Sequence, residues 1–71
     1  MRLLEVRDKN GNPFSIPADK IFRIESNDEG QGTLIHVDTG SKQIFYISSE
    51  PYGIVSQKFE ALSDENDDDN K

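Results

Sequence analysis

The sequence predicts a small α+β domain, in which an antiparallel sheet of four to five strands, able to curl into a partial barrel, is followed by one C-terminal amphipathic helix. Three observations predict this class. Short apolar runs that alternate with polar residues fill the chain as far as residue 48, and turn sequences rich in Gly, Asn and Pro separate them. The last apolar residues instead recur three and four positions apart, which is helical spacing. Strands first and a helix last is the order of an α+β fold, not of a parallel doubly wound sheet.

The first two strands are expected at residues 2–7 and 14–16, joined by a turn at residues 8–11. Asn and Gly favour this turn because both tolerate a positive φ. Pro17 then ends regular pairing, since it has no N–H to donate to a ladder. Residues 17–20 are expected to form a single helical turn.

The third strand is expected at residues 21–25. Ile21 and Ile24 cannot share a face of a regular strand, so the chain is expected to change conformation near Ile21. A polar, glycine-rich loop at residues 27–32 leads into a hairpin. The hairpin strands, 33–37 and 42–47, flank a four-residue turn that contains a glycine suited to the left-handed region.

The helix is expected to start after Ser48 or Ser49, since either serine is a good N-cap, and to end near Leu62. Its apolar face comprises Tyr52, Val55, Phe59 and Leu62. We therefore predict one domain over residues 1–62 and a disordered acidic tail over residues 63–71. Five of the fourteen acidic residues and one of the eight basic residues lie in that tail, which leaves a net charge of −2 for the other residues.

The hairpin carries apolar side chains at odd and at even positions of both strands, so both of its faces are expected to be apolar. Alternation within each strand predicts that the helix covers one face, made of Ile35, Val37, Phe45 and Ile47. The second face is expected to contain Leu34, Ile44 and Tyr46, joined by Phe22 and Leu3. We predict partner-binding residues on this second face, namely Phe22, Leu34, Ile44 and Tyr46.

Three arrangements would shield the second face from water. The sheet can curl into a partial barrel, it can pack against a second copy of the chain, or it can bind another protein. Leaving several such side chains exposed costs roughly 1.5–3 kcal/mol each, which is large for a domain of 71 residues. Because the chain has no cysteine for disulfides, a homo-oligomer is a natural source of additional stability.

Neither catalysis nor a bound cofactor or metal is expected. The absence of cysteine excludes thiolate sites, and the chain has a single histidine. His36 and Asp38 are spaced to share a strand face and resemble two members of a catalytic triad, but nothing in the spacing selects a nucleophile between Ser26 and Ser48. No apolar run matches a signal peptide or a membrane span, so a soluble cytoplasmic protein is expected.

Nucleic-acid association is the alternative function. Phe22, Phe45 and Tyr46 resemble the strand aromatics on which single-stranded nucleic acids stack. The net charge of −6 disfavours phosphate binding. An acidic chain can also mimic nucleic acid and occupy the basic groove of a partner.

Residues 6–59 resemble the small flagellar FlbD/SwrD-type proteins and similar small β-sheet proteins of bacteria and phages. The resemblance lies in Asn10-Gly11, the run 21–25, the spaced residues Thr33, Ile35 and Val37, and the helix start at Glu50. It implies a non-enzymatic accessory protein and carries over no catalytic residue. We therefore expect a regulatory or inhibitory protein-interaction module that works as a homo-oligomer.

Overall fold

The structure, a computed structural model, describes residues 2–28 and 32–69 of the chain. Its elements are β1 (Leu3–Arg7), β2 (Pro13–Pro17), the 3₁₀ turn η1 (Ala18–Lys20), β3 (Ile21–Asn27), β4 (Gly32–Asp38), β5 (Gln43–Ser48) and α1 (Tyr52–Asp69). The α+β class and the order of elements are as predicted. Half of the predicted polar loop of residues 27–32, namely residues 29–31, lies outside the described residues.

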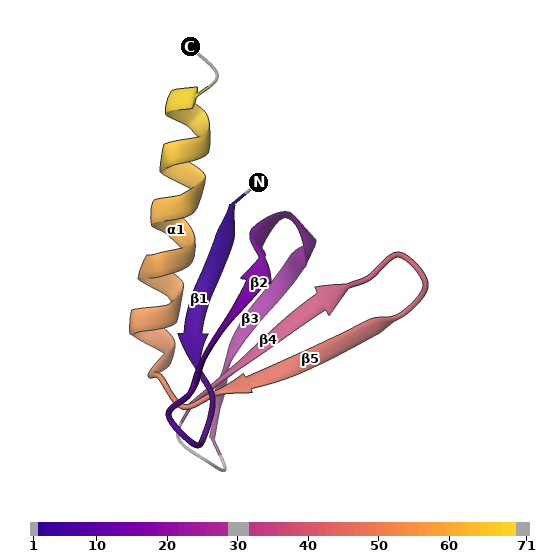
Figure 1. Ribbon diagram of the computed structural model, residues 1–71, viewed down its shortest axis with the longest axis vertical. Helices are drawn as coiled ribbons and strands as arrows, with labels where there is room; N and C mark the ends of the chain where they lie inside the picture. The colour runs from indigo at the N-terminus through magenta and orange to yellow at the C-terminus, as the bar shows by residue number, and fades with distance from the viewer. Residues whose placement is uncertain (1, 29–31, 70–71) are drawn as a thin grey trace.

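The five strands form two antiparallel sheets and not the single sheet that was predicted. β1 and β2 form a hairpin, and β3, β4 and β5 form a three-stranded sheet in that order. The sheets separate because Pro17 ends β2 and the chain turns through η1 before β3 begins. Figure 1 shows α1 standing beside β1, while the β4–β5 hairpin diverges from the other strands. Curling into a partial barrel stays a prediction.

The core lies between the two sheets and is closed on one side by the helix. Leu4 lies opposite Ile16 across the β1–β2 ladder, and Val6 lies opposite Phe14. Leu4, Val6 and Ile16 are almost fully buried, so the even-numbered side of these two strands faces the core. The remaining buried apolar residues are Ile35, Val37 and Val55.

The bend expected near Ile21 is confirmed as a register shift in the β3–β4 ladder. Ile21 lies opposite Val37, but Arg23 already lies opposite His36, so one extra residue, Phe22, enters the strand. A bulge of this kind reverses the facing of the residues that follow it. Ile21 and Ile24 therefore both pack against the core cluster.

The predicted faces of the β4–β5 hairpin are wrong. Asp38 lies opposite Gln43, so four residues connect the strands and each odd-numbered residue of β4 lies opposite an even-numbered residue of β5. Residues opposite each other share a face, so Ile35 shares its face with Tyr46 and not with Ile47. The inner face contains Thr33, Ile35, Val37, Ile44, Tyr46 and Ser48, and the opposite face contains Leu34, His36, Phe45 and Ile47.

Helix α1 begins later and ends later than the sequence predicted. Ser48 is the last residue of β5 and is not an N-cap; the carbonyl of Pro51 accepts the first helical bond, from the Val55 N–H at 3.1 Å. The helix extends to Asp69 because neither Gly nor Pro follows Gly53 to interrupt it. Val55 is fully buried, and Phe59 and Leu62 pack against the core, as the predicted apolar face required, but Tyr52, assigned to the same face, is 44% exposed.

Gly32 permits the close approach of β4 to the exit of β5. It is buried, and a Cβ at this position would clash with the carbonyl oxygen of Ser48. A larger residue would push away the segment that leads from β5 into α1. The placement of the helix therefore depends on this glycine.

Candidate functional site

The side of the β3–β4–β5 sheet that faces away from the core carries a cluster of apolar and aromatic side chains. We call this surface the outer face, and its members are Phe22, Leu34, His36, Phe45 and Ile47. Phe22 is 51% exposed, Phe45 is 55% exposed and Ile47 is 41% exposed. Large apolar side chains gathered on one exposed surface are typical of contact sites.

Three rings lie in a row across this sheet, one from each strand. The His36 ring centroid lies 6.0 Å from that of Phe22 and 5.9 Å from that of Phe45. Both separations are within the usual range for ring pairs. The bulge at Phe22 makes this row, because it brings the Phe22 ring onto the same side as the side chain at the next position.

The centre of the outer face is polar and hydrogen-bonded. His36 Nε2 donates to Glu25 Oε1 at 2.6 Å, and Arg23 Nη2 lies 3.4 Å from Glu25 Oε2. The hydrogen bond from His36, with the charge of Arg23 nearby, lowers the pKa of the Glu25 carboxyl below its ordinary value, although its partial desolvation opposes the change. This fixes the His36 ring between the two phenylalanines.

The four predicted partner-binding residues do not form one surface. Phe22 and Leu34 lie on the outer face, whereas Ile44 and Tyr46 lie on the inner face. The Tyr46 ring packs against Phe14 of the other sheet, with centroids 5.7 Å apart. Sequence reasoning missed Phe45 and Ile47 as members of the outer face, although the even number of residues in the hairpin connection was a signal for their facing.

The edge of β5 is the second feature of this region. The Thr39 N–H donates to the Lys42 carbonyl at 2.9 Å and closes the hairpin. Hydrogen-bonded and non-hydrogen-bonded pairs alternate from that point in an antiparallel ladder. Ile44, Tyr46 and Ser48 therefore bond to β4. The backbone groups of the alternate residues point away from β4, and these residues are Gln43, Phe45 and Ile47.

This edge lacks the devices that usually protect an edge strand. The six residues of β5 include no charged residue and no proline, and they pair with β4 without a register shift. Charges, prolines and bulges are what natural proteins use to block further pairing. β5 therefore presents the N–H and C=O groups of three alternate residues outward from an uncharged strand.

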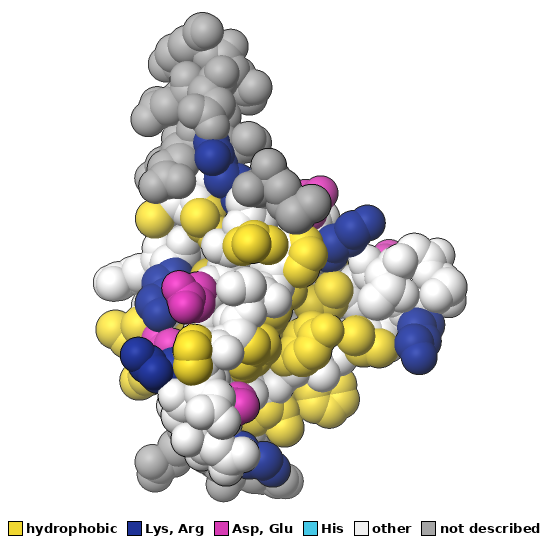
Figure 2. All heavy atoms as spheres, in the orientation of Figure 1, with side chains coloured by type: hydrophobic (Ala, Val, Ile, Leu, Met, Phe, Trp, Pro, Cys, Tyr) yellow, Lys and Arg dark blue, Asp and Glu magenta, His cyan; other side chains and the backbone are white. Residues whose placement is uncertain are grey.

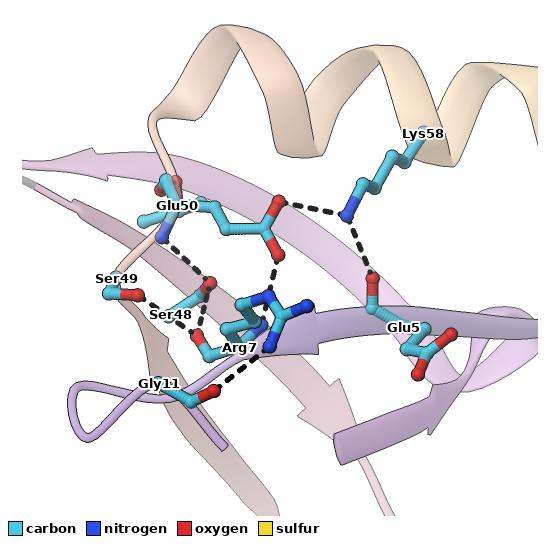
Figure 3. A network of polar contacts seen from close by, with 8 residues as sticks. Glu5, Arg7, Gly11, Ser48, Ser49, Glu50 and Lys58 are labelled. Atoms are coloured by element: carbon cyan, nitrogen blue, oxygen red, sulfur yellow. Dashed lines mark hydrogen bonds and ion pairs between the residues drawn. The ribbon is translucent and has the colours of Figure 1, made fainter. Parts of the chain in front are cut away.

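The edge of β1, by contrast, is occupied by side chains and backbone from the segment that enters α1 (Figure 3). The Arg7 N–H donates to Glu50 Oε2 at 3.0 Å, and the Arg7 carbonyl accepts from the Ser49 N–H at 2.9 Å. Lys58 Nζ donates to the Glu5 carbonyl at 3.2 Å and also pairs with Glu50 Oε1 at 2.8 Å. These groups supply what a neighbouring strand would supply.

The edges of β2 and β3 are blocked by other means. The Asp8 N–H donates to the Asn12 carbonyl, which sets the alternation in the β1–β2 ladder and directs the backbone of residues 13, 15 and 17 outward. Pro13 and Pro17 have no N–H, so Ser15 alone among these three offers a donor. β3 has its bulge and the charged residues Arg23 and Glu25.

Figure 2 shows hydrophobic side chains gathered on the side of the molecule where the β4–β5 hairpin diverges from β1 and β2. Tyr46 is 39% exposed although it belongs to the inner face. β5 is thus incompletely covered on both of its faces. The exposure of its apolar side chains at odd and even positions has one cause, which is that no described strand lies beside its outer edge.

The His36–Asp38 pairing that the sequence suggested is not formed. His36 is hydrogen-bonded to Glu25, not to Asp38, and Ser48 Oγ donates to the Arg7 carbonyl at 2.8 Å. Residues 2–28 and 32–69 contain no group of three or more His, Cys, Asp or Glu side chains that could hold a metal ion. In the part of the chain that the structure describes, no helix combines the length and apolar character of a membrane span.

Comparison with protein-family models, with curated proteins and with solved structures found no match to this chain.

Proposed function

We propose that this chain is a non-enzymatic protein-interaction module that works as a homo-oligomer, in the manner of a small regulatory or inhibitory accessory protein. The contact surface is the outer face together with the neighbouring β5. The observation that carries the proposal is the exposure of Phe45 and Ile47 on a strand that, among the described residues, has a neighbouring strand on one side only.

Energetics favour association through this surface. Phe45 and Ile47 are both more than two-fifths exposed, and burial of such a side chain stabilises a contact by up to about 1.5–3 kcal/mol. The rings of Phe22 and His36 extend the same surface across the sheet. The ion pair between Arg23 and Glu25, in contrast, gives the surface a polar group that can set the orientation of a partner.

Sedimentation velocity over a range of protein concentrations tests the proposal. The wild-type chain is expected to shift from monomer to a larger species as its concentration rises, and Phe45→Ser is expected to weaken that association by about tenfold or more. Because Phe45 is exposed, the variant should retain the thermal stability of the wild-type chain. A wild-type chain that remains monomeric at millimolar concentration would contradict the proposal.

Leu3→Ser is the matched control. Leu3 is 50% exposed and apolar, like Phe45, but it lies on the outward side of β1 in the other sheet. Its replacement removes a similar exposed area and should leave association unchanged. Equal losses in the two variants would indicate nonspecific adhesion of apolar side chains.

A second candidate function is single-strand nucleic-acid binding. The observation in its favour is the row formed by Phe22, His36 and Phe45, because bases stack on exposed rings of this kind. Tyr46 does not belong to the row. A titration with a short single-stranded oligonucleotide at several salt concentrations tests this function, since phosphate contacts make affinity fall steeply with salt. Absence of binding at low salt would reject it.

A further inference from the structure

We infer that the homo-oligomer is a two-fold dimer in which β5 of one copy pairs antiparallel with β5 of the second copy, centred on Phe45. This inference rests on the proposed function and adds the partner strand, its direction and its register. The two three-stranded sheets then form one continuous sheet across the dimer.

The backbone pattern of β5 sets the register. The outward groups belong to Gln43, Phe45 and Ile47, so only registers that place these residues opposite one another form hydrogen bonds. With the axis at Phe45, each Phe45 lies opposite its copy, and Gln43 lies opposite Ile47 of the second copy. All three outward residues then exchange both of their hydrogen bonds.

The same register improves burial on both faces of the strand. On the outer face the two Phe45 rings become neighbours, and Ile47 packs beside the aliphatic part of Gln43 from the second copy. On the inner face, Tyr46 lies opposite Ile44 of the second copy. Tyr46, Phe45 and Ile47, which are 39%, 55% and 41% exposed in the single chain, all gain cover.

Charge directs a second copy to β5 and away from the rest of the surface. The chain has a net charge of −6, so two copies repel each other over most of their surfaces. β5 has no charged residue, so pairing along it places no like charges directly opposite one another within the strand. The seam is the part of the sheet where the electrostatic cost of self-association is lowest.

The other edges explain why assembly stops at two copies. Antiparallel pairing about a two-fold axis uses the β5 edge of both copies. Among the described strands, the edge of β1 is filled by Ser49, Glu50 and Lys58, and the edge of β2 is blocked by Pro13 and Pro17. The dimer therefore presents no further unprotected strand of the β5 kind, and growth into fibres is not favoured.

Amide hydrogen exchange at low and high protein concentration tests the pairing directly. The amides of Gln43, Phe45 and Ile47 are expected to exchange about tenfold or more slowly when the chain is dimeric. Those of Ile44 and Tyr46, bonded to β4, should be protected at both concentrations. Odd-numbered amides that stay unprotected in an associated sample would overturn the inference.

A proline substitution provides an independent test. Gln43→Pro removes an outward N–H and leaves the bonds to β4 intact, so it is expected to weaken dimerisation by about tenfold or more without unfolding the chain. Ser15→Pro is the matched control, because Ser15 occupies the corresponding outward position on β2. Far-ultraviolet circular dichroism checks that both variants are folded.

The outcomes separate this inference from the proposed function. If Phe45→Ser weakens association but Gln43→Pro does not, the copies meet through side chains of the outer face, and strand pairing is wrong. If the wild-type chain never associates, the proposed function fails with it. If β5 instead pairs with a strand from another protein, the odd-numbered amides become protected only when that protein is added, which overturns the choice of a second copy.

Discussion

The edges of β1 and β5 both present outward backbone N–H and C=O groups, but only those of β1 are bonded to another part of the chain that the structure describes. Each strand directs the backbone groups of three odd-numbered residues away from its own hairpin partner. At β1, the Arg7 N–H and carbonyl and the Glu5 carbonyl are bonded to the segment between β5 and the second turn of α1. At β5, the corresponding groups of Phe45 and Ile47 face outward, beside exposed apolar side chains.

The difference teaches that a strand edge can be closed without another strand. Glu50 and Lys58 form an ion pair at 2.8 Å and, from that position, one accepts from the backbone of β1 and the other donates to it. Glu50 can do this because its side chain is only 16% exposed and is held in place by two partners. The cluster is a side-chain substitute for a ladder, and residues 2–28 and 32–69 provide no equivalent cluster at β5.

The largest effect is expected from detaching the helix that closes the β1 edge. Val55→Asp places an unpaired charge where Val55 is fully buried against the core, and it should lower the free energy of unfolding by about 3 kcal/mol or more. Urea denaturation followed by circular dichroism measures the change. Ile54→Asp is the control, since Ile54 is 45% exposed in the same helical turn, and a similar loss there would contradict this account.

A smaller effect is expected from removing the acceptor that closes the edge. Glu50→Ala leaves the Arg7 N–H and Lys58 Nζ without their carboxylate, so stability should fall by about 1–2 kcal/mol and the Arg7 amide should exchange faster. Glu50→Gln keeps an acceptor oxygen and should lose less. Equal losses from the two substitutions, measured by urea denaturation, would show that charge rather than hydrogen bonding closes the edge.

A charged residue on the outward edge of β5 should prevent pairing with little change in the free energy of unfolding. Ile47→Lys places a charge beside the outward backbone of β5, which is a usual protection for edge strands. Because Ile47 is 41% exposed, the free energy of unfolding of the monomer should change by no more than about 0.5 kcal/mol, while dimerisation is lost. A thermal scan of dilute protein measures the first quantity, and sedimentation measures the second. Retained dimerisation would place the seam elsewhere.

The smallest effect concerns pH. Folding lowers the pKa of Glu25, chiefly through its hydrogen bond with His36, so the folded state favours the ionised carboxylate. This contribution to stability is present above the ordinary pKa of 4.5 and is lost as the pH falls through the lower folded value. Thermal scans between pH 6 and pH 3 should therefore show a slightly shallower decline for Glu25→Gln than for the wild-type chain. Identical profiles would contradict the predicted linkage.

Sequence patterns predicted the elements better than their relations. Val55, Phe59 and Leu62 could be assigned to one buried helical face from their spacing, although Tyr52, assigned to the same face, is 44% exposed. Phe45 and Ile47 could not be assigned in the same way. Alternation separates the two faces of each strand, but it does not say whether the odd-numbered residues of one strand share a face with the odd-numbered or with the even-numbered residues of the next. That depends on the number of residues in the turn, and the prediction of faces went wrong there.

The candidate site was predicted only in part for the same reason. Phe22 and Leu34 were correctly joined on one face, but Ile44 and Tyr46 lie on the other. Ser48 and Ser49 were expected to cap the helix. Their hydroxyl groups instead contact the carbonyl of Arg7, which lies 41 and 42 positions earlier in the chain. Local spacing contains no information about a partner that folding brings from so far away.

The bonds between Arg7 and Glu50, and between Glu5 and Lys58, join residues 43 and 53 positions apart. When the chain is synthesised, the first hairpin therefore leaves the ribosome well before the groups that complete it. These bonds cannot form until Glu50 and Lys58 have also been synthesised, and contacts of such high sequence separation are formed slowly. In that interval the β1 edge of the nascent hairpin lacks these partners, and its backbone groups are free to pair with another strand.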